Sequence, residues 1–257
     1  SEIMALADVD APPLTQISSK NNYMALMARS MYKSLEELAE DELRLAGLRI
    51  NPENFNQSRS RYYTGLELQK LPGAEKIAIT GLPASLKIQQ FTFAPDEKSC
   101  AFVQVGEQGL SLWIINIDNG EARELVGPQL NATIGSPYLW GKDHKIYIRS
   151  KGDRGRISNK KELAKGPATQ DATGTVAPAR TYQDLLRNQQ DETVFDHYAK
   201  SAIVAIDLET GHQKEILPEA IYKRLSLSPD GQYLLTEEVQ KPYSYTLPYR
   251  SFPSRFN

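Results

Sequence analysis

FTFAPDEKSCAFVQV, residues 91–105, and LSLWIINIDNGEARELV, residues 110–126, decide the fold class of this chain. Each stretch holds two runs of β-branched, aromatic and other apolar residues of strand length, and a turn sequence separates the runs. The first turn contains Pro95-Asp96, and the second is Asp118-Asn119-Gly120, a strong hairpin signal. The two stretches therefore predict two successive antiparallel hairpins.

The same hairpin pattern recurs along the chain. Residues 225–239 repeat the first hairpin, residues 201–217 repeat the second, and residues 138–150 carry a divergent copy of the first. A further divergent pair of outer strands is predicted in residues 16–28 and 62–71. Without the insertions, the copies recur about every 40 to 45 residues with four strands each, which is the signature of a β-propeller blade.

The predicted fold is all-β, a partial β-propeller of four-stranded antiparallel blades with two small helical insertions. A seven-bladed propeller needs roughly 280 to 315 residues before any insertion, whereas this chain has 257. Residues 1–257 are thus expected to form an incomplete N-terminal propeller portion, with about two full blades and parts of two more. We expect the natural chain to continue past Asn257. Open blade edges also offer a surface for self-association.

The first insertion, residues 34–47, is predicted to be a short helix. Ser34 and Glu37 have the spacing of a capping box, and Gly47 suits a helix C-cap. The helix would pack on a blade; the alternative is a helix that binds a partner.

The second insertion, residues 152–198, is predicted to be a loop followed by a helix. Residues 152–180 are rich in Gly, Pro, Ala, Thr and Lys without periodicity, whereas residues 181–198 look helical. The predicted packing residues of that helix are Leu185, Leu186, Val194, Phe195 and Tyr198.

Composition excludes several kinds of site. Thirty basic and thirty-two acidic side chains give a formal net charge of -2, so we expect no nucleic-acid partner. Apolar runs stay far below the roughly 20 residues of a membrane span, which argues against membrane insertion. With one cysteine, Cys100, and three scattered histidines, the sequence predicts no metal and no cofactor.

No recognisable catalytic motif occurs in the 257 residues. The strings G-x-S-x-G, H-E-x-x-H, Walker A and the dinucleotide glycine motif are all missing from the sequence. The adjacent carboxylates Glu237 and Glu238 could bind a peptide's N-terminal ammonium. However, neighbours on a strand point to opposite faces, so convergence on one amine would need a bulge or a helix. We predict no catalytic residue.

A basic segment, residues 149–165, carries seven basic side chains against two acidic ones. It is either a solvated loop or a site for a carboxylate, for which arginine offers a planar bidentate fork. The candidate substrate-facing residues are Arg149, Arg154 and Arg156.

Four longer motifs carry a resemblance to a known family. They are LAGLRINP (45–52), RSRYYTGL (59–66), QDLLRNQQDETVFDHYA (183–199) and KPYSYTLPYRSFP (241–253). In this order they resemble the N-terminal region of glutamyl endopeptidases, which are prolyl-oligopeptidase-type serine peptidases of chloroplasts and bacteria. The similarity extends over nearly the whole chain.

This resemblance implies a propeller that caps a C-terminal α/β-hydrolase domain, which carries a Ser-Asp-His triad. The whole enzyme would cleave preferentially after glutamate. The implied partners are that domain of the same parent chain and a peptide substrate. No triad residue has a counterpart here. Arg154-Gly155 falls where relatives also have Arg-Gly in a basic loop, so Arg154 is the first candidate for substrate contact. The implied location is a plastid in a plant, or export in a bacterium, and the chain itself carries no targeting segment.

The leading hypothesis is a non-catalytic propeller that gates substrate entry to the missing hydrolase domain. The rival is a free-standing propeller-like scaffold that binds proteins. A third alternative is a fragment with neither activity nor partner of its own.

Overall fold

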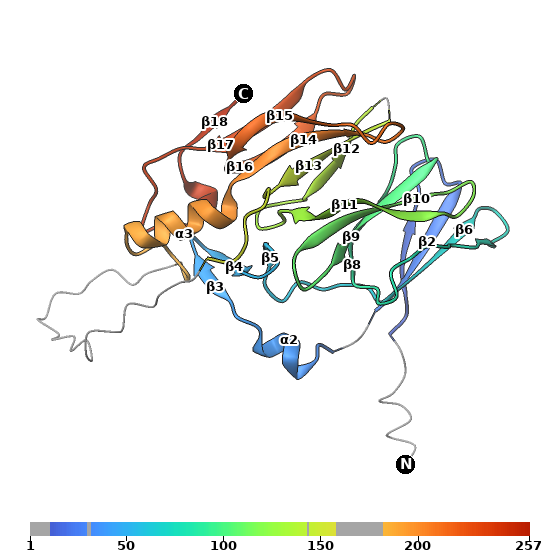
Figure 1. Cartoon of the computed structure of the whole chain (residues 1–257), viewed down its shortest axis with the longest axis horizontal. Coiled ribbons are helices and arrows are strands. Elements are labelled where there is room, and N and C mark those ends of the chain that lie inside the picture. Colours follow the sequence, from blue (N-terminus) through green and yellow to red (C-terminus); the bar gives the residue numbers. More distant parts are fainter. Residues whose placement is uncertain (1–10, 30–31, 143, 158–181) are drawn as a thin grey trace, which may run out of the picture.

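The computed structural model describes residues 11–29, 32–142, 144–157 and 182–257 (Figure 1). Strands dominate these residues, as predicted. The helical elements are α2 (Leu35–Ala39), α3 (Gln189–Ala199) and a 3-10 turn, η1 (Tyr249–Ser251).

A four-stranded sheet has the order β1-β2-β6-β7 with antiparallel pairing. Strands β2 and β6 lie on either side of the first insertion in sequence, and Tyr23 pairs with Lys70. The strands predicted in residues 16–28 and 62–71 are therefore present and paired. The bounds are β1 Leu14–Ile17, β2 Tyr23–Ala28, β6 Gly65–Lys70 and β7 Glu75–Ile77.

The largest sheet has eight strands, with the order β15-β14-β13-β11-β10-β9-β8 and with β12 paired to β13. Every predicted hairpin within residues 91–150 and 201–217 is present. A single pairing, Leu130 with Ser150, joins the run β8–β11 to the run β12–β15. The bounds are β8 Ile88–Phe93, β9 Ser99–Val105, β10 Leu110–Asn116, β11 Ala122–Leu130, β12 Tyr138–Trp140, β13 Lys145–Ser150, β14 Ser201–Asp207 and β15 Gln213–Ala220.

Two three-stranded sheets complete the architecture. One contains β3 (Leu43–Leu45), β4 (Leu48–Asn51) and β5 (Asn56–Gln57). The other contains β16 (Tyr222–Leu227), β17 (Leu234–Val239) and β18 (Ser254–Phe256). All of these sheets are open, and the two four-strand runs share one sheet, so the division into four-stranded propeller blades stays a prediction.

The first predicted helix is shorter than expected. The capping box of Ser34 and Glu37 is present, but α2 ends at Ala39. Residues from Leu43 on form the β3–β4 hairpin, in which Ala46 and Gly47 have φ of 53° and 79°. Two central residues with positive φ are typical of the two-residue hairpin turn, so Gly47 belongs to the turn between two strands and is not a helix C-cap.

The second predicted helix starts later than expected. Thr181 and most of the loop before it lie outside the described residues. The side chain of Asn188 accepts a hydrogen bond from the Asp191 amide and is the N-cap of α3. Leu185 and Leu186 are buried, as predicted, although they precede the helix. The predicted packing residues Val194, Phe195 and Tyr198 are buried on one face of α3.

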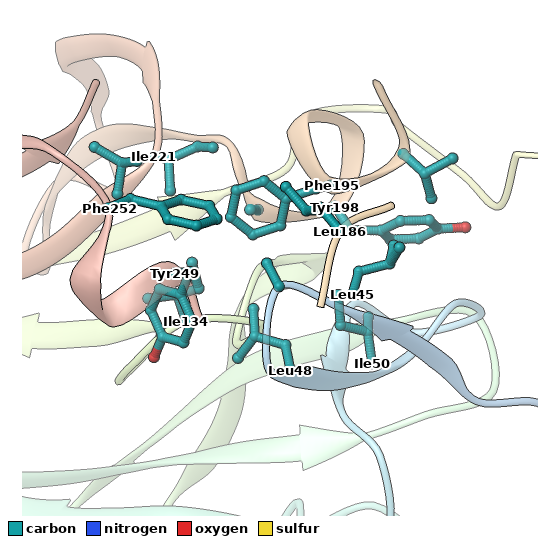
Figure 2. Close-up of a cluster of buried hydrophobic side chains, with 14 of the residues drawn as sticks. Leu45, Leu48, Ile50, Ile134, Leu186, Phe195, Tyr198, Ile221, Tyr249 and Phe252 are labelled. Carbon is teal, nitrogen blue, oxygen red and sulfur yellow. The ribbon is translucent and has the colours of Figure 1, made fainter. Parts of the chain in front are cut away.

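Three buried clusters form the core. One lies between the four-stranded sheet and β8–β10, and a second joins β9–β11 to β12–β14. The third, called the helix-centred cluster, joins α3 to the β3–β4 hairpin and to the C-terminal segment (Figure 2). Its buried members are Leu45, Ala46, Leu48, Ile50, Phe55, Ile134, Leu186, Val194, Phe195, Tyr198, Ala199, Ile221, Val239, Tyr249 and Phe252.

Candidate functional site

Arg154, the first candidate for substrate contact, lies against the C-terminus of α3. Its guanidinium donates to the carbonyl oxygens of His197 at 2.8 Å and Lys200 at 2.6 Å, while Nε donates to the Lys151 carbonyl at 2.9 Å. Glu219 lies 3.4 Å from Nη2. A cation here satisfies carbonyls that the helix end leaves free and opposes the negative end of the helix dipole. These contacts account for the position of Arg154 without a ligand.

Arg149 is buried, with 4% of its surface exposed. Nη1 donates to the Tyr222 carbonyl at 2.6 Å and Nε donates to the Ser136 carbonyl at 3.0 Å. Burial lowers the pKa of its guanidinium to about 10. Both contacts join β13 to neighbouring segments, so Arg149 links parts of the fold.

Arg156 is exposed and bridges two carboxylates. Nη2 lies 2.6 Å from Asp41, and Nη1 donates to Glu53. The hydrogen bonds that Arg156 donates to these two carboxylates raise its pKa. The three arginines are thus close in sequence but lie in three different surroundings. Contact of any of them with a substrate stays a prediction, and Lys160, Lys161 and Lys165 of the same basic segment lie outside the described residues.

The two adjacent carboxylates on β17 differ in their partners. Glu237 lies 2.7 Å from Lys223 Nζ and accepts a hydrogen bond from Ser254 at 2.8 Å. These hydrogen bonds lower its pKa. A lysine of this chain therefore already neutralises Glu237. The β16–β17 pairing is irregular between Tyr222 and Arg224. Even so, among the described residues Lys223 forms its ion pair with Glu237 and not with Glu238.

A polar hollow of about 230 Å³ lies between β8 and the segment that follows β4. We call it the amide hollow. The buried side chains of Asn56 and Gln89 join its two walls through a 2.9 Å hydrogen bond. The main side chains around it are Asn56, Gln57, Arg61, Tyr63, Gln89 and Gln90.

A second, smaller hollow of about 50 Å³ shares Asn56, Gln57 and Gln89 with the first. Asn54 lines it, and its Oδ1 atom is buried without a hydrogen-bond partner among the described residues. Such an acceptor is costly unless a donor from outside the chain reaches it.

Glu37, Tyr62 and Lys87 also line the smaller hollow. Burial and the hydrogen bond to Glu37 raise the pKa of Tyr62 to about 12. Burial alone would raise the pKa of Glu37, but its hydrogen bonds with Tyr62 and Lys87 outweigh that effect and lower it. The carboxylate of Glu37 is therefore charged and already paired.

Another cavity, of about 870 Å³, lies among the turns of the eight-stranded sheet. Its lining mixes acidic and basic side chains, and His144 lies 3.9 Å from Asp96 and 3.8 Å from Glu209. This mixture of charges favours no single class of ligand.

In the part of the chain that the structure describes, no group of three or more His, Cys, Asp or Glu side chains is placed to hold a metal ion. The same residues include no helix with the length and apolar character needed to cross a bilayer. Cys100 is buried, and burial raises the pKa of its thiol, which keeps the thiol protonated.

Comparison with curated proteins gives two related sequences. The probable glutamyl endopeptidase, chloroplastic, of Oryza sativa subsp. japonica is 35% identical over 266 residues, which cover 96% of this chain and 28% of that protein. The protein of the same name from Arabidopsis thaliana is 35% identical over 263 residues, covering 96% of this chain and 27% of its own length. The chain is a glutamyl endopeptidase homologue. It spans little more than a quarter of the length of these relatives.

Solved structures similar to this chain include peptidases. Acylaminoacyl peptidase from Pyrococcus horikoshii matches with a TM-score of 0.44 and 13% identity, over 93% of this chain and 29% of that chain. The β-propeller domain of the Trilobed protease from Pyrococcus furiosus matches with a TM-score of 0.43 and 12% identity, over 96% of this chain and 55% of that chain. No protein-family model matches the sequence.

The amide hollow is not predicted from the sequence. Its walls come from residues 56–63 and 89–90, which are distant in sequence. One local signal is present, because the polar pair Gln89-Gln90 directly precedes the predicted hairpin of residues 91–105.

Proposed function

We propose that this chain is a non-catalytic part of a serine peptidase that cleaves peptides preferentially after glutamate. The carrying observation is the homology to probable glutamyl endopeptidases over 96% of this chain and only 28% of the first relative. The sequence of 257 residues also contains no G-x-S-x-G string for a nucleophilic serine. In the proposal, the chemistry belongs to an α/β-hydrolase domain of the same parent chain.

Within this proposal, the chain forms part of a β-propeller that limits which peptides reach the hydrolase domain. The runs β8–β11 and β12–β15 would be two full blades, because each has four antiparallel strands in chain order. The other two strand groups would contribute parts of two more. The parent protein would act in a plastid, as the names of the two plant relatives suggest, or after export in a bacterium.

The test is peptide hydrolysis by two proteins: the 257-residue chain, and the same chain joined to whatever follows it in the natural reading frame. We expect no cleavage of glutamate-containing peptides by the first, and cleavage by the second that a serine-directed inhibitor abolishes. Inhibitor-sensitive turnover by the 257-residue chain would overturn the proposal. A stop codon after Asn257 would favour a free-standing scaffold that binds proteins.

The preference for glutamate is proposed to involve the basic segment, with Arg154 as the first candidate. Charge reversal in Arg154→Glu should lower the ratio of kcat/KM for glutamate over glutamine substrates in the full-length enzyme. Because Arg154 also holds the end of α3, the comparison needs Arg154→Gln at a temperature where both variants stay folded. An unchanged ratio in both variants would leave this segment as solvated surface.

A further inference from the structure

Several polar side chains around the amide hollow have no partner within the described residues. Within residues 11–29, 32–142, 144–157 and 182–257, no hydrogen bond or ion pair engages the side chains of Gln57, Arg61, Tyr63 and Gln90, nor the Nε2 atom of Gln89. Nearby charged groups behave differently: Arg59 lies 3.8 Å from Glu42, and Lys87 lies 3.3 Å from Glu37. Several donors and acceptors that line this hollow are therefore free to bind a ligand.

The backbone around the hollow has an uncommon conformation at three residues that are not glycine. Phe55, Arg59 and Gln90 have φ of 55°, 56° and 49°. At Gln90 the positive φ coincides with an irregularity in the β8–β9 pairing between Gln89 and Thr92. Such bulges re-aim side chains, and backbone strain of this kind collects at binding sites.

The chemistry of the free groups suits an extended peptide. Glutamine amides both donate and accept, which matches the alternating N–H and C=O groups of a peptide backbone. Strand β8 is the last strand of the large sheet, but Tyr63 pairs with Ile88 on its outer edge, so a peptide in the hollow would meet side chains rather than extend the sheet. The unpartnered Oδ1 of Asn54 in the adjoining hollow offers one more acceptor for an N–H donor.

Arg61 supplies the charge at this site. It lines the hollow, is exposed, and has no carboxylate partner among the described residues. A guanidinium binds a carboxylate through two parallel hydrogen bonds. We propose that the amide hollow binds an extended peptide through its backbone, while Arg61 holds a carboxylate from an acidic side chain or from the peptide's C-terminus. This site belongs to the 257-residue chain and does not depend on the proposed peptidase function.

The experiment measures peptide binding to the 257-residue chain by isothermal titration calorimetry. Three peptides serve as probes: acetyl-Ala-Ala-Glu-Ala-Ala-amide, the same peptide with Gln in place of Glu, and that Gln peptide with a free C-terminal carboxylate. We expect at least one carboxylate-bearing peptide to bind about tenfold more tightly than the capped Gln peptide. The peptide that binds more tightly than the capped Gln peptide shows which carboxylate is recognised.

Two variants and one control locate the site. Arg61→Gln should abolish the roughly tenfold preference, whereas Arg255→Gln, at an exposed arginine of β18 without an ion pair among the described residues, should keep it. Gln57→Ala should weaken all three peptides alike, because it removes a contact to the backbone. Absence of binding, equal binding of all three peptides, or a preference retained in Arg61→Gln would overturn the proposal. Far-UV circular dichroism verifies that each variant is folded.

Discussion

The hairpins from β8 to β15 and the helix-centred cluster hold the chain together in different ways. In the hairpins, each strand mostly pairs with its neighbours along the chain. Strand β10, for example, pairs Ile115 with Cys100 of β9 on one side and with Ala122 of β11 on the other. The helix-centred cluster instead joins side chains such as Leu48, Phe195 and Phe252, which are far apart in sequence (Figure 2). The hairpin repeat therefore forms the sheets, whereas long-range packing positions the described part of the basic segment.

The largest expected effect comes from breaking the helix-centred cluster with Phe195→Ala. Phe195 is fully buried, and its ring meets those of Tyr243 and Phe252 edge-on at 5.4 and 5.9 Å. Its truncation should lower the free energy of unfolding by about 3–5 kcal/mol. Urea denaturation measures the change. Leu35→Ala, at an exposed residue of α2, is the control and should change it by less than about 0.5 kcal/mol.

A cost below about 1 kcal/mol for Phe195→Ala would contradict the long-range packing of α3.

The next largest effect is a difference in stability cost between alanine substitutions at two equivalent turns of the hairpin repeat. Gly120 and Gly211 both have φ of 71°, but a Cβ at Gly120 would lie 1.9 Å from the Ala78 carbonyl oxygen, whereas nothing lies within 4 Å at Gly211. Gly211→Ala should cost about 1 kcal/mol for the left-handed backbone alone. Gly120→Ala should cost about 2–4 kcal/mol, because the neighbouring segment must also move.

Thermal denaturation of both alanine variants measures this difference. Equal costs would show that the Gly120 turn does not touch Ala78 in solution.

A smaller effect is expected from Arg154→Gln, which removes the donors that satisfy the C-terminal carbonyls of α3. The loss should be about 1–3 kcal/mol, because charged donors to buried carbonyls are worth more than neutral ones. Arg156→Gln is the matched control two residues away: its exposed ion pairs are screened by water and salt, so little change is expected. Equal losses in the two variants, measured by urea denaturation, would contradict the capping role of Arg154.

The smallest effect concerns acid stability at Asp196 in α3. Burial alone would raise its pKa, but hydrogen bonds from Tyr243 at 2.5 Å and Lys241, with the charges of Lys200 and Lys241, outweigh burial and lower it. A lowered pKa in the folded state gives stability that is present above the ordinary value of 3.8 and is lost as the pH falls below it.

Urea denaturation at about pH 5 and about pH 3 should therefore show a smaller acid loss for Asp196→Asn than for the unmodified chain. Parallel losses in the two proteins would refute the role of Asp196.

The accuracy of the sequence predictions follows the range of the interactions involved. The strands of residues 91–150 were predicted because alternation and turn residues are local signals. The capping box at Ser34 was also recognised, but Gly47 was not interpreted correctly. A helix C-cap and a two-residue hairpin turn both need positive φ there, so the glycine alone cannot distinguish them.

The candidate site shows the same limit. Residue type marks Arg149, Arg154 and Arg156 as candidates, but each of them also has a carbonyl or carboxylate partner that is more than 40 residues away in sequence. The amide hollow escaped prediction because Arg61 and Gln90 come together only when β8 packs beside residues 56–63.

The sequence by itself determined the mostly-β architecture, the hairpin repeat and the resemblance to glutamyl endopeptidases, because strand periodicity, turn residues and motifs act over a few neighbouring positions. Only the tertiary structure decided which arginines are neutralised by the chain and which polar groups stay free. Hydrogen bonds and ion pairs require contact within a few ångströms, and that proximity depends on how distant segments pack.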